Sequence, residues 1–146
     1  MNYENYLILE FPSKSVNEGL ARSAVACFVS QLDPTMEELG DIKTAVSEAV
    51  TNCIVHAYPG DIGIISLKCR ILQGSIIDIV IRDRGVGIED IERARQPMYT
   101  TGGDERSGMG FTIMENFMDT LKVTSSGVGT KIVMTKKLAP LSEIRA

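Results

Sequence analysis

The chain has 146 residues, of which 44% are hydrophobic and 23% are charged, and its formal net charge is -4. This composition is typical of a globular protein and excludes the disordered and fibrous classes, so we expect a single domain over residues 1–146. Acidic residues outnumber basic ones, which argues against direct binding of nucleic acid. The N-terminal segment MNYENYLILEF has no basic region and only a short apolar run. We therefore expect neither a secretory signal nor a membrane span, and a cytoplasmic location.

The first half of the chain is predicted to form one strand and two helices. Residues 6–11 have the composition of a strand, and residues 15–31 carry apolar side chains at helical spacing. A second helix is predicted to begin at Asp33, because an aspartate can cap a helix and Pro34 suits its first turn. We expect this helix to end at about Ala57.

The second half is predicted to contain four strands and two helices. Gln73-Gly74-Ser75 is a short polar connection that is typical of a hairpin. Apolar periodicity largely fails over residues 96–107, for which we expect a mobile loop. The predicted strands cover residues 62–72, 76–83, 121–125 and 130–138, and the predicted helices cover residues 88–95 and 110–118.

Short turns between successive strands decide the predicted fold class. Strands joined by such turns cannot be parallel neighbours, and a doubly wound fold needs a helix after nearly every strand. We therefore expect an α/β (α+β) two-layer sandwich, in which a mixed, mostly antiparallel sheet carries its helices on one face.

The three cysteines, Cys27, Cys53 and Cys69, lie among apolar neighbours and show no C-x-x-C spacing. Free cysteine behaves as a small hydrophobic residue, and an odd number without metal-ligand spacing does not form a disulfide framework. We predict buried free thiols and no zinc site.

Three polar residues of the second predicted helix, Glu48, Asn52 and His56, are spaced four residues apart. Successive members are rotated by only about 40° and form one polar stripe. The stripe borders an apolar arc that includes Ala49, whereas Ser47 is expected to face solvent. The spacing therefore predicts that the stripe lies at the rim of the buried face.

This stripe has the chemistry of a metal and phosphoryl-transfer site. Magnesium prefers oxygen ligands and completes its shell with phosphates and water, which makes Asn52 a candidate metal ligand and Glu48 a candidate base. An ordinary amphipathic helix with polar boundary residues has the same spacing, so the pattern alone leaves both interpretations open. His56 lies near the predicted helix end, where the helix dipole favours a cation, and we predict a structural role for it.

A predicted strand delivers Asp83 to its end, and two glycines follow in the sequence Asp83-Arg84-Gly85-Val86-Gly87. A carboxylate can accept a hydrogen bond from the exocyclic amine of adenine, and glycines allow a flat base to approach the backbone. Many strand exits share this Asp-x-Gly-x-Gly pattern, so alone it does not distinguish a base-binding site from a turn.

Thr130, at the start of the last predicted strand, is a candidate for a hydroxyl beside the same base. The segment Arg106-Ser107-Gly108-Met109-Gly110 ends a predicted loop and begins a predicted helix. Helix N-termini present unpaired amides to anions, and a neighbouring arginine can bind phosphate oxygens, so we expect a phosphate site here. It is not a P-loop, because the chain contains no G-x-x-x-x-G-K-[ST] sequence.

These motifs are more specific together than alone. In chain order they are Glu48-x-x-x-Asn52-x-x-x-His56-Ala57-Tyr58, Asp83-x-Gly85-x-Gly87, Arg106-Ser107-Gly108-Met109-Gly110 and Gly129-Thr130. The combination resembles the superfamily of gyrase, Hsp90, histidine kinases and MutL, which has the Bergerat ATP-binding fold. Within that superfamily, the chain is most similar to the single-domain serine kinases that act as anti-sigma factors in sporulation. The similarity spans nearly the whole chain.

The resemblance implies a role for each matching residue. Asn52 would ligate Mg2+, Glu48 would activate the attacking hydroxyl, and Asp83 would hold the adenine of ATP. The segment 106–110 would bind the phosphates. Arg22 would lie on the partner-binding surface, although a solvated helix arginine explains it equally well from spacing alone.

The resemblance also implies a function. The family uses Mg-ATP to phosphorylate a serine on an anti-anti-sigma factor, and its homodimer holds a sporulation sigma factor inactive. The alternative is a binding module in which ATP controls the choice of partner with little phosphoryl transfer. The two differ at Glu48, because phosphoryl transfer needs an oriented nucleophile and nucleotide binding does not.

Overall fold

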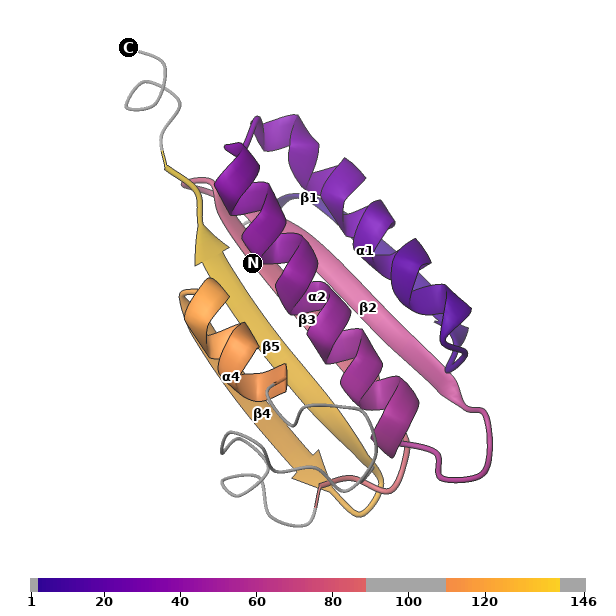
Figure 1. Ribbon diagram of the computed structural model, residues 1–146. Coiled ribbons are helices and arrows are strands. Elements are labelled where there is room, and N and C mark those ends of the chain that lie inside the picture. The colour runs from indigo at the N-terminus through magenta and orange to yellow at the C-terminus, as the bar shows by residue number, and fades with distance from the viewer. Residues whose placement is uncertain (1–2, 89–109, 140–146) are drawn as a thin grey trace.

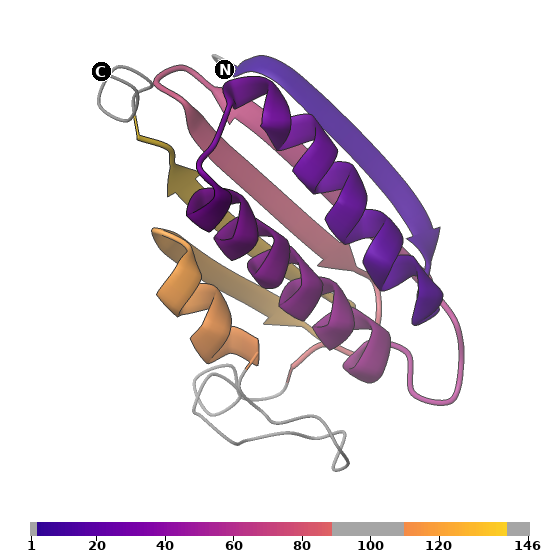
Figure 2. The same ribbon diagram turned by 45° about the horizontal axis from the view of Figure 1, so that its top comes forward.

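The computed structural model describes residues 3–88 and 110–139. In these ranges, five strands form one sheet in the order β1-β2-β3-β5-β4, and helices α1, α2 and α4 lie on one face of it (Figure 1, Figure 2). The elements are β1 (Tyr3–Pro12), α1 (Val16–Val29), the short 3-10 helix η1 (Ser30–Leu32), α2 (Met36–His56), β2 (Ile64–Leu72), β3 (Ile76–Asp83), α4 (Gly110–Phe117), β4 (Thr120–Ser126) and β5 (Gly129–Lys137). The predicted two-layer α+β sandwich is confirmed.

All four strand pairings are antiparallel, so the sheet is simpler than the mixed one expected. β5 lies between β3 and β4 and runs antiparallel to both, so these two strands share a direction without pairing. The predicted hairpin between β2 and β3 is confirmed. It turns at Gly74 and Ser75, whose φ angles are 86° and 60°, in the left-handed region that tight hairpins use.

Alternate residues of the central strands face the helices and form the core. The largest fully buried side chains include Ile42, Ile65, Leu67, Ile71, Ile77, Ile79, Ile81, Met114, Ile132 and Met134. Side chains alternate between the two faces of a strand, so the last residue of β3, Asp83, points to the same side as Ile81. The fold thus places a carboxylate at the end of an apolar row, in the layer between sheet and helices.

Helix α2 begins later than predicted. Its N-cap is Thr35, whose Oγ1 accepts a hydrogen bond from the Glu38 N–H at 3.0 Å, while Glu38 Oε1 accepts one from the Thr35 N–H at 2.9 Å. Such a capping box satisfies two N–H groups at once. The predicted cap at Asp33 is wrong, because Asp33 adopts a left-handed conformation with a φ of 57° and ends η1.

Helix α1 does not bury Cys27, in contrast to the prediction. Val25 and Val29 are fully buried, whereas Cys27 is exposed. Two residues along a helix are about 200° apart, so Cys27 points away from the face that Val25 buries. The prediction of a buried thiol is therefore wrong for Cys27 and confirmed for Cys53 and Cys69. Among the helices in the described ranges, none is long and apolar enough to span a membrane.

Candidate functional site

The polar stripe of α2 lies at the edge of the helix's buried face, as predicted. Ala49 and Cys53 are buried, whereas Glu48, Asn52 and His56 are partly exposed. His56 lies in the last turn of the helix, at the position where the dipole favours a cation. The stripe is therefore shielded on one side by the core and open on the other.

The N-terminus of α4 lies beside Glu48. α4 packs against α2 on the same face of the sheet (Figure 2), and a Cβ built on Gly110 would lie 3.4 Å from Glu48 Oε1. The first turn of a helix carries unpaired N–H groups and a partial positive charge, which favour anions. Packing thus brings together two predicted site residues that are far apart in the sequence.

Asp83 is a buried polar group of the site, and only 4% of it is exposed. Its Oδ1 accepts hydrogen bonds from the backbone N–H groups of Gly85, at 2.9 Å, and of Thr130, at 3.2 Å. Burial, together with the neighbouring Asp83 carboxylate, raises the pKa of the Cys53 thiol. An ionised carboxylate has about four lone-pair sites, so these donors leave capacity for another, such as an amine.

The residues after Asp83 run directly against the end of α2. The Val86 N–H donates to the Ala57 carbonyl at 2.8 Å. A Cβ on Gly85 would overlap that carbonyl and lie 2.7 Å from Ala57 Cα, so only glycine fits without displacement. Gly85 therefore has a packing role in addition to the predicted one at the base.

Ser125 of β4 joins this segment to β5. Its Oγ accepts a hydrogen bond from the Ile88 N–H at 2.6 Å and lies 2.9 Å from Thr130 Oγ1. Gly87 has a φ of 77°, and a Cβ there would lie 2.9 Å from Ser125 Oγ. Our sequence reasoning missed Ser125. The available signal was its place opposite Thr130 in the predicted final hairpin.

Tyr58, just beyond α2, holds the same segment from the other side. Its hydroxyl accepts a hydrogen bond from the Arg84 N–H at 2.8 Å and donates one to the Ile64 carbonyl at 2.6 Å. One side chain therefore joins α2, β2 and the segment after β3. In the sequence, Tyr58 ends the motif that begins at Glu48, but its hydrogen-bond partners could not be read from that motif.

Arg22 lies where α1 meets α2. Its Nη1 is 2.9 Å from Glu18 Oε2, and the same oxygen accepts a hydrogen bond from the Ser47 hydroxyl at 2.6 Å. Ser47, which was predicted to face solvent, is only partly exposed, because α1 lies against that side of α2. Arg22, Ser47 and Glu48 line one cleft of about 370 Å³. The predicted partner-binding and catalytic residues therefore border a common opening.

The structure thus gathers most of the predicted residues around the C-terminal half of α2. One group, joined by hydrogen bonds, consists of Asp83, Gly85 and Thr130, and Gly87 lies against Ser125, which contacts Thr130. The other consists of Glu48 and Gly110. Four predicted residues, Arg106, Ser107, Gly108 and Met109, lie outside the described residues, as do nearly all of the predicted helix at 88–95 and the predicted loop at 96–107.

Comparison with known proteins agrees with this arrangement. Residues 11–136 match the family model of the histidine kinase-like ATPase domain. The RsbU and RsbW domains of a Mycobacterium tuberculosis protein superpose with a TM-score of 0.71 at 18% identity, over 94% of this chain and 34% of that one. A histidine kinase domain from Erythrobacter litoralis superposes with a TM-score of 0.58 at 21% identity, over 83% of this chain and 61% of that one. Fold and sequence together define a histidine kinase-like ATPase domain.

Relatives of similar length narrow the family further. An anti-sigma F factor of Caldanaerobacter subterraneus subsp. tengcongensis is 58% identical over 138 residues, which are 93% of this chain and 96% of that protein. An anti-sigma F factor of Clostridium acetobutylicum is 51% identical over 142 residues, which are 96% of this chain and 99% of that protein. The chain belongs to the family of anti-sigma F factors.

Proposed function

We propose that the protein is an anti-sigma factor that binds and inhibits a sporulation sigma factor, and that it uses Mg-ATP to phosphorylate a serine of its anti-anti-sigma factor. The relatives support the first part by their names. The observation that carries the second is the buried, multiply anchored carboxylate of Asp83, which keeps capacity for one more donor. We also propose that residues 1–146 act as one such domain.

In this proposal Asp83 accepts a hydrogen bond from the amine of adenine. Its backbone partners fix the carboxylate before the base arrives, so binding does not have to order it. Gly85, Gly87 and Thr130 border the base. The segment 106–110, whose last residue begins α4, binds the phosphates, because a helix N-terminus offers N–H donors and positive charge.

Asn52 supplies an amide oxygen for magnesium. The described residues contain no group of three or more His, Cys, Asp or Glu side chains that could hold a metal, so the ion would share its shell between Asn52, phosphates and water, as magnesium often does. Bound Mg-ATP supplies the phosphoryl group and charge neutralisation. Glu48, on the rim of the cleft that it shares with Arg22, orients the partner's serine hydroxyl and accepts its proton.

The partner surfaces follow from the same cleft and from the edge of the sheet. Arg22 lines the same cleft as Glu48, so a partner whose serine reaches Glu48 would also contact Arg22. Strand β1 is an edge strand, and its Tyr6 and Ile8 side chains are exposed. Edge strands can pair across a twofold axis, and we propose a homodimer built in this way. We propose a cytoplasmic location, because the protein acts on a sigma factor in this proposal.

A transfer assay with γ-labelled ATP and candidate anti-anti-sigma proteins tests the proposal. Glu48→Gln keeps the size of the side chain but removes its basicity, and we expect transfer to fall about 100-fold or more, while ATP and the sigma factor still bind. Glu37→Gln makes the same change in the exposed first turn of α2 and should transfer as the parent does.

Two results of this assay would contradict the proposal. Undiminished transfer by Glu48→Gln would remove the base role. Absence of transfer by the parent, with ATP and the sigma factor both bound, would favour the ATP-controlled binding module instead.

A further inference from the structure

Lys136 is a charged residue on the otherwise uncharged, helix-facing side of β5. It follows the buried residues Ile132 and Met134 on the same face of the strand, and its side chain is only 13% exposed. An ammonium group in such a place costs free energy unless it is paired and hydrogen-bonded. The proposed nucleotide chemistry does not use Lys136, so its partners have to explain its position.

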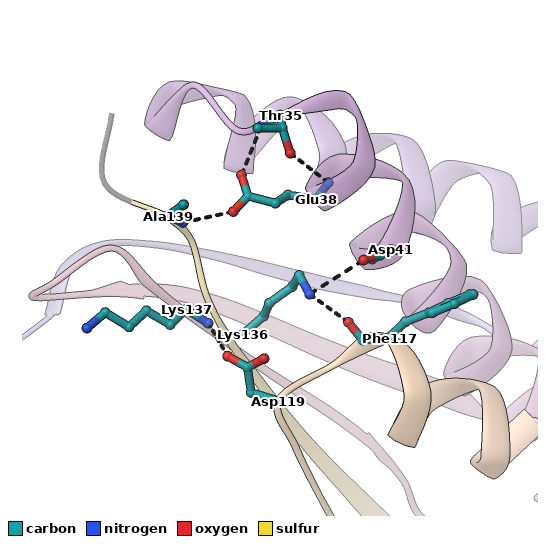
Figure 3. Close-up of polar contacts among 8 residues, drawn as sticks. All are labelled: Thr35, Glu38, Asp41, Phe117, Asp119, Lys136, Lys137 and Ala139. Atoms are coloured by element: carbon teal, nitrogen blue, oxygen red, sulfur yellow. Dashed lines mark hydrogen bonds and ion pairs between the residues drawn. The ribbon is translucent and has the colours of Figure 1, made fainter. Parts of the chain in front are cut away.

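Figure 3 shows Lys136 reaching from β5 to both α2 and α4. Its Nζ donates to the Phe117 carbonyl at 2.8 Å and lies 3.6 Å from Asp41 Oδ2. Phe117 is the last residue of α4, where unpaired carbonyls and the helix dipole favour a cation. One ammonium group therefore joins three elements.

Neighbouring contacts hold the same elements together. The Asp119 N–H donates to the Thr135 carbonyl at 2.8 Å. Asp119 Oδ2 accepts a hydrogen bond from the Lys137 N–H at 2.7 Å (Figure 3). Beyond β5, the Ala139 N–H donates to Glu38 Oε2 at 2.8 Å. Because Glu38 also caps α2, the end of β5 is held against α2. Asp119, just after α4, is held against β5. The C-terminal end of α4 is therefore fixed relative to both β5 and α2.

The opposite end of α4 lies at the proposed phosphate site. The helix has eight residues, so only about 10 Å separates its ends. A short helix that is held at Phe117 is also held at Gly110, which lies beside Glu48. We propose that Lys136 is a positioning residue, which fixes the N-terminus of α4 at Glu48 and thereby sets the affinity for ATP. This inference rests on the proposed function, because it assumes that the phosphates bind at that N-terminus.

Calorimetric titration of the full chain with Mg-ATP tests the inference, well below the unfolding temperature. Lys136→Met keeps the length of the stem but removes the ammonium, and we expect ATP to bind about 3- to 10-fold more weakly. Lys136→Arg can still reach both partners and should recover most of the affinity. Lys137→Met removes the same charge one residue away, from a side chain on the exposed face, and should bind ATP like the parent.

Urea unfolding of the same variants separates positioning from mere stabilisation. If Lys136→Met is less stable but binds ATP as the parent does, the positioning role is overturned. If that variant does not fold, Asp41→Asn carries the test, because it leaves the bond from Lys136 to Phe117 in place. We expect Asp41→Asn to bind ATP about twofold more weakly or worse. An unchanged ATP affinity would overturn the inference. A parent that binds no ATP would instead overturn the proposed function, and this inference with it.

Discussion

Replacing Gly85 by alanine tests the contact between the segment after β3 and the end of α2. The added Cβ would overlap the Ala57 carbonyl oxygen and lie 2.7 Å from Ala57 Cα, and backbone atoms cannot rotate away. The segment must move, which breaks the 2.8 Å hydrogen bond from the Val86 N–H to the Ala57 carbonyl. Overpacking costs about 1–3 kcal/mol and a lost hydrogen bond about 0.5–1.5 kcal/mol, so we expect the free energy of unfolding to fall by about 2–4 kcal/mol.

Urea unfolding followed by circular dichroism measures this change, with Gly40→Ala as the matched control. Gly40 lies within α2, and nothing lies within 4 Å of a Cβ built on it. Alanine is favoured over glycine inside a helix by about 0.5–1 kcal/mol, so the control should be more stable than the parent. Surface substitutions usually change the free energy of unfolding by no more than about 0.5 kcal/mol. If Gly85→Ala changes it by no more than that, the close contact between Gly85 and Ala57 would be refuted.

Acid stability and thiol reactivity provide further tests. The pKa of Glu38 lies below its ordinary value of 4.5, because burial, which raises it, is outweighed by hydrogen bonds to the carboxylate and by a nearby lysine. A depressed pKa stabilises the fold above the ordinary value, and this contribution is lost as the pH falls through the lowered pKa. The free energies of unfolding of the parent and of Glu38→Gln should therefore converge as the pH falls. A difference that stays constant with pH would contradict the lowered pKa of Glu38. Cys27 is exposed, whereas Cys53 and Cys69 are buried, and burial, with the charge of a neighbouring aspartate, raises the pKa of Cys69 to about 12. A maleimide at neutral pH should label one thiol of the native chain and all three after unfolding, and a second labelled thiol in the native state would show that the burial is incomplete.

Features with a local signal could be predicted from the sequence. The spacing of Glu48 and Asn52 follows from helix geometry, and the hairpin at Gly74 follows from turn chemistry, so both were predicted correctly. The start of α2 also had a local signal, the capping-box pair Thr35 and Glu38, but the Asp-Pro sequence just before it offered a competing start.

Features that depend on packing could not be predicted. Whether Cys27 or Val25 faces the core is decided by where α1 lies on α2 and the sheet, and a helix with apolar residues on several sides leaves this open. The partners of Tyr58 and Lys136 are distant in the sequence. The place of Gly110 beside Glu48 likewise depends on how α4 packs on α2. A single sequence contains no record of such pairs.

Titration with Mg-ATP and Mg-GTP tests most directly whether adenine binds at Asp83. Asp83→Asn keeps an oxygen that can accept the N–H groups of Gly85 and Thr130, but it loses the charge and places an amide nitrogen at the other position. A hydrogen bond to a charged group is worth about 1.5–3 kcal/mol, so we expect the variant to bind ATP about 10- to 100-fold more weakly and to lose the parent's preference for ATP over GTP. Unchanged ATP affinity with an unchanged preference would contradict the proposed adenine site.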